Sequence, residues 1–191
     1  MSALVIVFRT VSLLAFAGPM LLGVGGQRGE PKTPAGHRGG GRAPVVANLA
    51  AFSVFFPSLI IFSGSTNGST ALRLASLGTI LAVAGAALIL RSRTELGPAW
   101  SFMPKAGQET GLITTGPYHL VRHPIYLGLA LLALGEALAL SSWPAFLIVL
   151  CGIVPTFAWR ARAEETLLSR TFGQRYALYQ KQTQMIIPYV F

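Results

Sequence analysis

The sequence predicts an all-α, polytopic integral membrane protein with about five transmembrane helices. Of its 191 residues, 52% are hydrophobic and only 11% are charged, and the mean hydropathy is +0.58. A soluble domain carries about 25% charged residues, so this chain has too few charges to cover a folded body in water. Its basic residues also gather in alternate segments between long apolar stretches, as in multi-pass membrane proteins.

Five apolar stretches are the candidate spans: residues 3–24, 44–63, 71–90, 125–142 and 143–159. A helix needs roughly 20 apolar residues to cross a bilayer, with about 17 as a practical minimum, and the first three stretches meet this length. The last two are shorter and meet at Ser141-Ser142-Trp143-Pro144, which predicts a tight turn within a transmembrane hairpin. We expect a single domain over residues 1–191.

The first stretch has to be distinguished from a secretory signal peptide. A signal peptide carries its positive charge before the apolar core, whereas mostly apolar residues precede Arg9 here. We therefore expect a true first span. Arg9 would then lie near an interface or extend its side chain toward one.

The distribution of basic residues predicts the orientation. Residues 25–43, 91–124 and the tail after 159 hold 13 of the 15 Lys and Arg residues. With five spans these segments lie on one side, and the positive-inside bias places the N-terminus outside and the C-terminus in the cytoplasm. The basic residues of 25–43 would face membrane lipids. The net charge of +9 does not indicate nucleic-acid binding, which requires one basic stripe on a soluble fold.

Three features within the predicted spans lead to further predictions. Small residues crowd 71–90 and predict close helix packing, and Pro155 predicts a kink in the last span. Glu136 is a functional candidate because a carboxylate within a membrane span is costly. Alternatively, Glu136 lies near the span end or is neutral and hydrogen-bonded.

The polar segment 91–124 ends in a dense cluster at the start of the fourth span, where Arg122, His123 and Pro124 follow one another. Pro124 fits the first turn of a helix, where a missing N–H costs nothing. The free N–H groups of that helix end would then lie beside Arg122 and His123 and predict a site for a carboxylate or phosphate.

A metal site is the first alternative for this cluster. His119 and His123 are spaced i,i+4, which suits a metal ion on one helix face. Pro124 disfavours a continuous helix through them, and neither a cysteine nor a nearby acidic residue completes a ligand set. We therefore expect no metal.

A second polar cluster opens the tail. Arg160, Glu164 and Glu165 lie at the start of an amphipathic helix that we expect to end before Gly173. Arg160 and Glu164 stand one helical turn apart, as a salt-bridged pair would, although a solvated pair at the membrane interface has the same spacing. Adjacent carboxylates in so basic a chain favour a partner with positive charge.

Several ordered motifs lie between residues 91 and 191. They are Gly116-Pro117-Tyr118, RHPxYxG from Arg122 to Gly128, RxxxEE from Arg160 to Glu165, FGxxYxxY from Phe172 to Tyr179, and Ile187-Pro188. Together they resemble the isoprenylcysteine carboxyl methyltransferase family, to which the membrane phospholipid methyltransferases are related. The resemblance covers roughly half of the chain, and the first two spans contain none of its motifs.

The resemblance implies an S-adenosylmethionine-dependent methyltransferase whose active site, formed by residues 91–128 and 160–191, lies at the cytoplasmic membrane face. The residues implied in cofactor binding are Thr110, Gly111, Leu112, Ile113, Tyr118, Arg122, His123, Pro124, Ile125, Tyr126 and Glu164. The catalytic residues would be Arg160, Glu164 and Glu165, with Arg160 nearer the methyl acceptor. The chain departs from eukaryotic members at Met103, where they carry a glutamine, and at residues 162–163.

The acceptor decides what chemistry the protein must supply. A carboxylate needs no general base, and Arg160 would orient it through paired hydrogen bonds. A phenol or an amine must lose a proton, to His119, Glu165 or a water. Carboxyl O-methylation of a prenylated cysteine is the activity best known for the family; phospholipid N-, phenolic-lipid O- and thiol S-methylation stay open. A non-enzymatic transporter or scaffold subunit, with Glu136 as its functional residue, is the alternative of another class.

Overall fold

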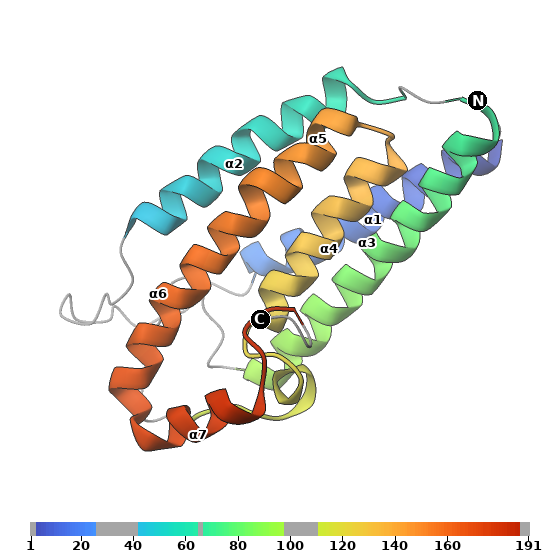
Figure 1. Ribbon diagram of the computed structural model, residues 1–191. Helices are drawn as coiled ribbons and strands as arrows, with labels where there is room; N and C mark the ends of the chain where they lie inside the picture. The colour runs from blue at the N-terminus through green and yellow to red at the C-terminus, as the bar shows by residue number, and fades with distance from the viewer. Residues whose placement is uncertain (1–2, 26–41, 65–66, 98–110, 188–191) are drawn as a thin grey trace.

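The computed structural model describes residues 3–25, 42–64, 67–97 and 111–187, and it confirms the prediction of an all-α fold. The helices form an elongated bundle, with the short helix α7 across one end (Figure 1). The elements are α1 (Ala3–Gly25), α2 (Arg42–Ile61), α3 (Gly68–Leu96), the 3-10 turn η4 (Gly116–His119), α4 (Pro124–Ala139), α5 (Trp143–Ile148), the π-turn η5 (Val149–Ile153), α6 (Val154–Phe172) and α7 (Gln174–Gln182).

Among the residues that the structure describes, three helical stretches are long and apolar enough to cross a membrane: Ala43–Ile61, Gly68–Leu96 and Trp143–Phe172. Helix α4 has 16 residues, or about 24 Å at 1.5 Å per residue, against a hydrocarbon core of about 30 Å. The structure thus supports a multi-pass membrane protein with three clear spans, and the count of five stays a prediction. Large apolar side chains, such as Leu14, Leu49 and Ile80, are exposed on the bundle surface, as a surface facing lipid requires.

The predicted hairpin is confirmed, but its second arm is longer than expected. Helix α4 ends at Ala139 and α5 begins at Trp143. From there the chain stays helical through α5, η5 and α6 to Phe172, so the tail helix expected from Arg160 continues the last span. The helix stops at Gly173. This residue has a φ of 54°, which glycine adopts without a steric penalty.

The distortion predicted from Pro155 takes the form of a π-turn. Pro155 is the second residue of α6 and directly follows η5. Proline has no N–H to donate, and its ring clashes with the carbonyl four residues earlier, that of Cys151. The wider turn through Val149–Ile153 removes this conflict without ending the helix.

Helices α3 and α4 approach each other closely through glycines, as the small residues of 71–90 predict. A Cβ atom on Gly78 would lie 2.4 Å from the backbone nitrogen of Ala139, and one on Gly135 would lie 2.6 Å from that of Ala82. No larger residue fits at either position without moving a backbone. This contact fixes α4, and therefore the functional residues at its N-terminus, relative to the end of α3.

Arg9 and Glu136 both lie at the C-terminal end of α4. Arg9 is only 9% exposed, and its Nε donates to the carbonyl of Ala139 at 2.9 Å. It is thus buried against the last carbonyls of α4, which carry partial negative charge, and its position relative to a membrane interface stays a prediction. Glu136 is 1% exposed and accepts a hydrogen bond from Ser12 at 3.3 Å. Its position agrees with the hydrogen-bonded alternative.

Candidate functional site

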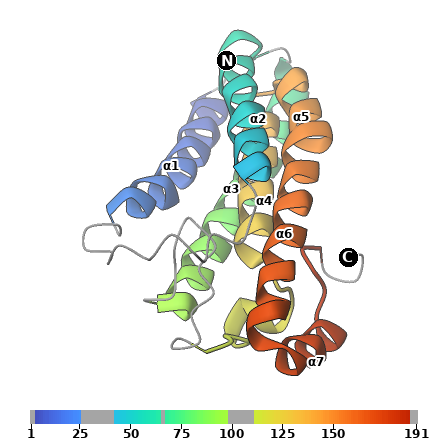
Figure 2. The same cartoon turned by 90° about the vertical axis from the view of Figure 1, so that its left-hand side faces the viewer.

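The polar residues of the two sequence motifs meet at the end of the bundle where α7 lies. We call Arg122, His123, Tyr126, Arg160, Glu164 and Glu165 the site cluster. Three of its members come from the start of α4 and three from α6, and every one of them is buried or half-buried. The structure therefore brings the two motifs into contact, as the short hairpin between them predicts. Figure 2 shows the start of α4 beside α6 at this end.

Glu164 links Tyr126 and Arg160 within the site cluster. Its Oε1 accepts hydrogen bonds from the Tyr126 hydroxyl and from Nε of Arg160, the latter at 3.2 Å. Its Oε2 lies 3.7 Å from Nδ1 of His123, outside hydrogen-bond distance. The Arg160 guanidinium carbon is also 5.6 Å from the centroid of the Tyr126 ring, a distance suited to a cation–π contact. The predicted pairing of Arg160 with Glu164 is confirmed.

The Glu165 side chain points in a different direction from that of Glu164, toward α7. Nε of Arg122 lies 2.5 Å from its Oε1, and Nε2 of Gln180 donates to its Oε2 at 3.2 Å. Nε2 of His123 lies 3.5 Å from Oε1. Burial raises the pKa of the Glu165 carboxyl, but the neighbouring His123 and Arg122 outweigh it and hold the pKa at about 2. Glu165 is therefore an ionised carboxylate at neutral pH.

His123 has a buried nitrogen that lacks a hydrogen bond. The ring occupies the N-cap position of α4 and stacks on Tyr126, with centroids 5.5 Å apart, and Tyr126 stacks on Phe157 at 5.2 Å. Nε2 of His123 is buried and has no hydrogen-bond partner among the residues that the structure describes. Such an atom carries a desolvation cost that a bound ligand would relieve. Sequence reasoning did not identify Phe157, which carries only a core pattern.

The anion site predicted at the N-terminus of α4 stays a prediction, and the two residues just before this helix use their own backbone N–H groups within the protein. The backbone N–H of Arg122 donates to the Gln184 carbonyl at 2.8 Å, and that of His123 donates to the Met185 carbonyl at 2.9 Å. Pro124 has no N–H to offer. Residues 183–187, which we call the return segment, thus cover this helix end with their own carbonyls.

The Arg122 side chain is also engaged within the protein. Besides Glu165, its guanidinium donates to the carbonyls of Thr183 and Gln180, the latter at 3.3 Å. Arg122 therefore holds the site cluster to α7 and the return segment, whereas the sequence assigned it to the cofactor. Spacing along the chain could not show this, because its partners lie 43 to 61 residues away.

Two tyrosines of α7 also contact this region. The Tyr179 hydroxyl donates to the Tyr118 carbonyl at 2.6 Å, and Tyr176 is completely buried. Burial raises the pKa of Tyr118, Tyr176 and Tyr179, that of Tyr179 to about 12, so all three stay protonated. Tyr176 and Tyr179 belong to a motif of the resemblance and stand i,i+3 on one helix face. That spacing was the signal that could have placed α7 against the site.

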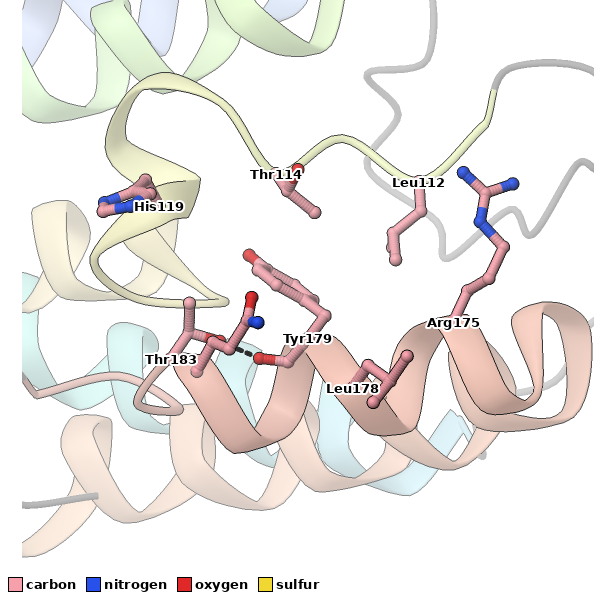
Figure 3. Close-up of a pocket in the computed structure, with 8 residues that line it drawn as sticks. Leu112, Thr114, His119, Arg175, Leu178, Tyr179 and Thr183 are labelled. Carbon is pink, nitrogen blue, oxygen red and sulfur yellow. Dashed lines mark hydrogen bonds between the residues drawn. The ribbon is translucent and has the colours of Figure 1, made fainter.

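Of the predicted cofactor-binding residues 110–113, those that the structure describes lie outside the site cluster. Thr110, like Met103, lies outside the described residues, and Gly111 is exposed. Leu112 lines a pocket of about 340 Å³ with Thr114, His119, Arg175, Leu178, Tyr179, Gln182 and Thr183 (Figure 3). No member of the site cluster lines this pocket. Pro124 is buried and Ile125 half-buried at the start of α4.

His119 and His123 do not share a helix, as Pro124 predicted. His119 ends the 3-10 turn η4 and is exposed, whereas His123 is buried at the N-cap of α4. Within the described part of the chain, no three His, Cys, Asp or Glu side chains gather in an arrangement that could hold a metal ion.

Known proteins with similar sequences are named as methyltransferases, which is the activity that the motifs of this chain predict. The chain is 31% identical over 141 residues to the protein-S-isoprenylcysteine O-methyltransferase of Saccharomyces cerevisiae, covering 72% of this chain and 57% of that protein. It is 30% identical over 138 residues to the Schizosaccharomyces pombe protein of the same name, covering 71% of this chain and 56% of the relative. The chain thus spans little more than half the length of these curated relatives.

A solved structure and a family match agree with these relatives. The structure of the eukaryotic intramembrane Ras methyltransferase, an isoprenylcysteine carboxyl methyltransferase, superposes with a TM-score of 0.62 at 18% identity. The match covers 93% of this chain and 63% of that one, which shows a shared fold. Residues 74–175, more than half of the sequence, match the phospholipid methyltransferase family. The chain belongs to this family, and its predicted resemblance to the isoprenylcysteine methyltransferases is confirmed.

Proposed function

We propose that this protein is an S-adenosylmethionine-dependent methyltransferase that acts at the cytoplasmic membrane face on the carboxylate of a lipophilic, prenylcysteine-like acceptor. The observation that carries the proposal is the site cluster, in which Glu164 lies near Nδ1 and Glu165 near Nε2 of the buried His123, and Nε2 has no hydrogen-bond partner among the described residues. The names of the relatives favour a carboxylate over a phenol, an amine or a thiol as acceptor.

The polar groups of the site cluster fit the methyl donor, which presents a carboxylate, an ammonium and a sulfonium. Nε2 of His123 needs a polar partner that the described residues do not supply. Oε2 of Glu164 has no donor within hydrogen-bond distance on the side of His123, so it would face a cationic group. Glu165 suits a cation less, because Arg122 already neutralises it. The pocket beside Leu112 and the residues next to it would complete the donor site.

The proposed chemistry requires positioning more than acid or base. S-adenosylmethionine supplies a methyl group already activated by its sulfonium, and transfer to a carboxylate oxygen breaks one S–C bond, forms one O–C bond and moves no proton. Arg160 would orient the acceptor carboxylate through its planar guanidinium, in the place its family motif implies. Tyr126 and Phe157 form an apolar stack behind this residue and would exclude water from the reacting groups.

The cytoplasmic location rests on charge. The site cluster lies at the end of the bundle that also carries α7 (Figure 1). The segments 91–124 and 160–191, whose described residues include those of this end, hold most of the basic residues that the positive-inside bias assigns to the cytoplasm. A donor from the cytoplasm and an acceptor from the membrane would then meet at the site cluster.

The test uses the full chain in lipid with labelled S-adenosylmethionine. A prenylcysteine analogue with a free carboxyl should give a product that releases labelled methanol in base, because esters are base-labile. The matching carboxamide should give none. A base-stable product from native lipid extract would favour N-, phenolic O- or S-methylation instead. Absence of saturable S-adenosylhomocysteine binding by calorimetry would contradict the whole class.

A further inference from the structure

The side chain of Gln180 on helix α7 donates a hydrogen bond to a carboxylate of the site cluster. Its Nε2 donates to Oε2 of Glu165 at 3.2 Å, and its backbone carbonyl accepts from Arg122 at 3.3 Å. Gln180 is half-buried, so this contact is partly shielded from solvent. It joins α7 to the one carboxylate of the cluster that lies within 3.5 Å of Nε2 of His123.

Two partners on opposite sides fix the orientation of this carboxylate. Arg122 lies 2.5 Å from Oε1 of Glu165, and Gln180 binds Oε2. A carboxylate held at only one oxygen is free to rotate about its terminal torsion, which is broad and roughly two-fold. Held at both oxygens, Glu165 keeps Oε1 directed toward Nε2 of His123.

The fold at this point does not depend on Gln180. The N–H groups of Arg122 and His123 donate to the carbonyls of the return segment, and the Tyr179 hydroxyl donates to the Tyr118 carbonyl. The backbone contact of α7 with Arg122, through the Gln180 carbonyl, survives any change of the Gln180 side chain. Loss of the Gln180 amide should therefore alter Glu165 without detaching α7.

We propose that Gln180 is a positioning residue of the methyl-transfer site, which holds the Glu165 carboxylate beside Nε2 of His123, the atom assigned to the methyl donor. This inference rests on the proposed function above. Gln180 itself touches neither donor nor acceptor in this scheme, because Glu165 stands between it and His123. The effect of its loss should consequently fall on the donor and spare the acceptor.

The experiment compares three variants of the full chain in detergent or lipid. Gln180→Met keeps the length of the side chain and removes its N–H donors. Gln180→Lys restores a donor, since an ammonium can bind Oε2 of Glu165. Gln174→Met makes the same change as the first variant at an exposed position of the same helix, outside the site cluster. The measurements are S-adenosylhomocysteine affinity, the KM of each substrate, kcat, and the thermal unfolding midpoint.

Gln180→Met should weaken S-adenosylhomocysteine binding and raise the donor KM by about tenfold, the size expected for one hydrogen bond to a charged group. The acceptor KM and the unfolding midpoint should stay near those of the wild type, and Gln180→Lys should recover most of the lost affinity. Gln174→Met should match the wild type.

Equal donor affinity in Gln180→Met and the wild type would overturn the inference, as would a loss that Gln180→Lys fails to restore. A lowered unfolding midpoint with unchanged donor affinity would show a purely structural role and would also overturn it. A wild-type protein without saturable binding would instead contradict the proposed function, so the two failures are distinguishable.

Discussion

Glu164 and Glu165 are neighbours in the chain but have different surroundings. Glu164 binds Tyr126 and Arg160 within the bundle, while Glu165 binds Arg122 and α7. Successive helix residues point about 100° apart, so the EE pair faces two structural elements at once. We assign Glu164 to the ligands and Glu165 to the support of His123.

This assignment predicts a strong effect at Glu164. Glu164→Gln preserves the shape of the side chain but removes the negative charge that would face the donor, and we expect S-adenosylhomocysteine affinity to fall about tenfold or more. Calorimetry on the purified protein measures it. Glu95→Gln is the matched control, because it neutralises a carboxylate paired with Arg91 at 2.9 Å outside the site cluster. Equal losses in both variants would contradict the assignment.

Glu165 predicts a dependence of stability on pH. Its pKa is lowered in the fold from 4.5 to about 2. A carboxyl with a depressed folded-state pKa stabilises the fold fully above its unfolded-state value, and this contribution is lost as the pH falls toward the folded-state value. The window therefore runs from about pH 4.5 down to about pH 2.

The measurement is the thermal unfolding midpoint in detergent, from pH 6 to pH 3. The wild type should exceed Glu165→Gln most at pH 6, and the difference should shrink as the pH falls below 4.5, because the Glu165 carboxyl becomes protonated in the unfolded state while it stays ionised in the fold. Parallel curves across this range would show that the interactions of Glu165 with Arg122 and His123 contribute no pH-dependent stability.

At the scale of elements, the contact of α3 with α4 depends on the absence of side chains. Gly78 and Gly135 bring the two backbones together, and the same holds for Gly85 and Gly128 nearer the site. In lipid the hydrophobic effect does not drive helices together, so close packing of this kind has to supply the association. The position of His123 at the start of α4 depends on it.

Gly135→Ala should therefore destabilise the protein by about 1–3 kcal/mol, the usual cost of overpacking, because its Cβ would lie 2.6 Å from Ala82. Gly152→Ala is the matched control, since its nearest neighbours would lie at 3.8 Å. Gly152→Ala should be neutral or slightly stabilising. Thermal unfolding of both variants tests this, and similar midpoints for the two would contradict close packing as the cause.

The last span shows how one helix serves two environments. Its apolar part lies between Trp143 and Trp159, both 48% exposed and about 24 Å apart along a helix. Tryptophan is enriched at membrane interfaces, so these residues agree with a span of 143–159. The continuation to Phe172 carries the charged side chains of the site cluster beyond Trp159 without a break in the helix.

At the scale of the whole molecule, the site cluster lies at one end of the bundle. Asn67 and the buried Arg9 belong to the other end, where Arg9 contacts the carbonyl of Ala139. The proposed orientation places the end with α7 in the cytoplasm. The two ends should therefore differ in their accessibility from outside the cell.

Cysteine labelling tests this orientation. In a Cys151→Ala background, Asn67→Cys should react with a membrane-impermeant maleimide in intact cells, and Leu120→Cys should react only after the membrane is opened. Both positions are exposed on the molecule. The opposite pattern would invert the proposed topology, and labelling of both in intact cells would contradict a separation of the two positions by the membrane.

The sequence by itself determined the membrane class, the helical hairpin and the two motifs of the site, because hydropathy, proline and glycine act on neighbouring residues. The pairing of Arg160 with Glu164 was predicted for the same reason, because the two residues are only one helical turn apart in the chain. Only the tertiary structure decided that Arg122 is bound by Glu165 and by the carbonyls of α7 and the return segment. Those partners lie more than forty residues away, and contacts at such separations arise from the packing of helices, which local periodicity does not encode.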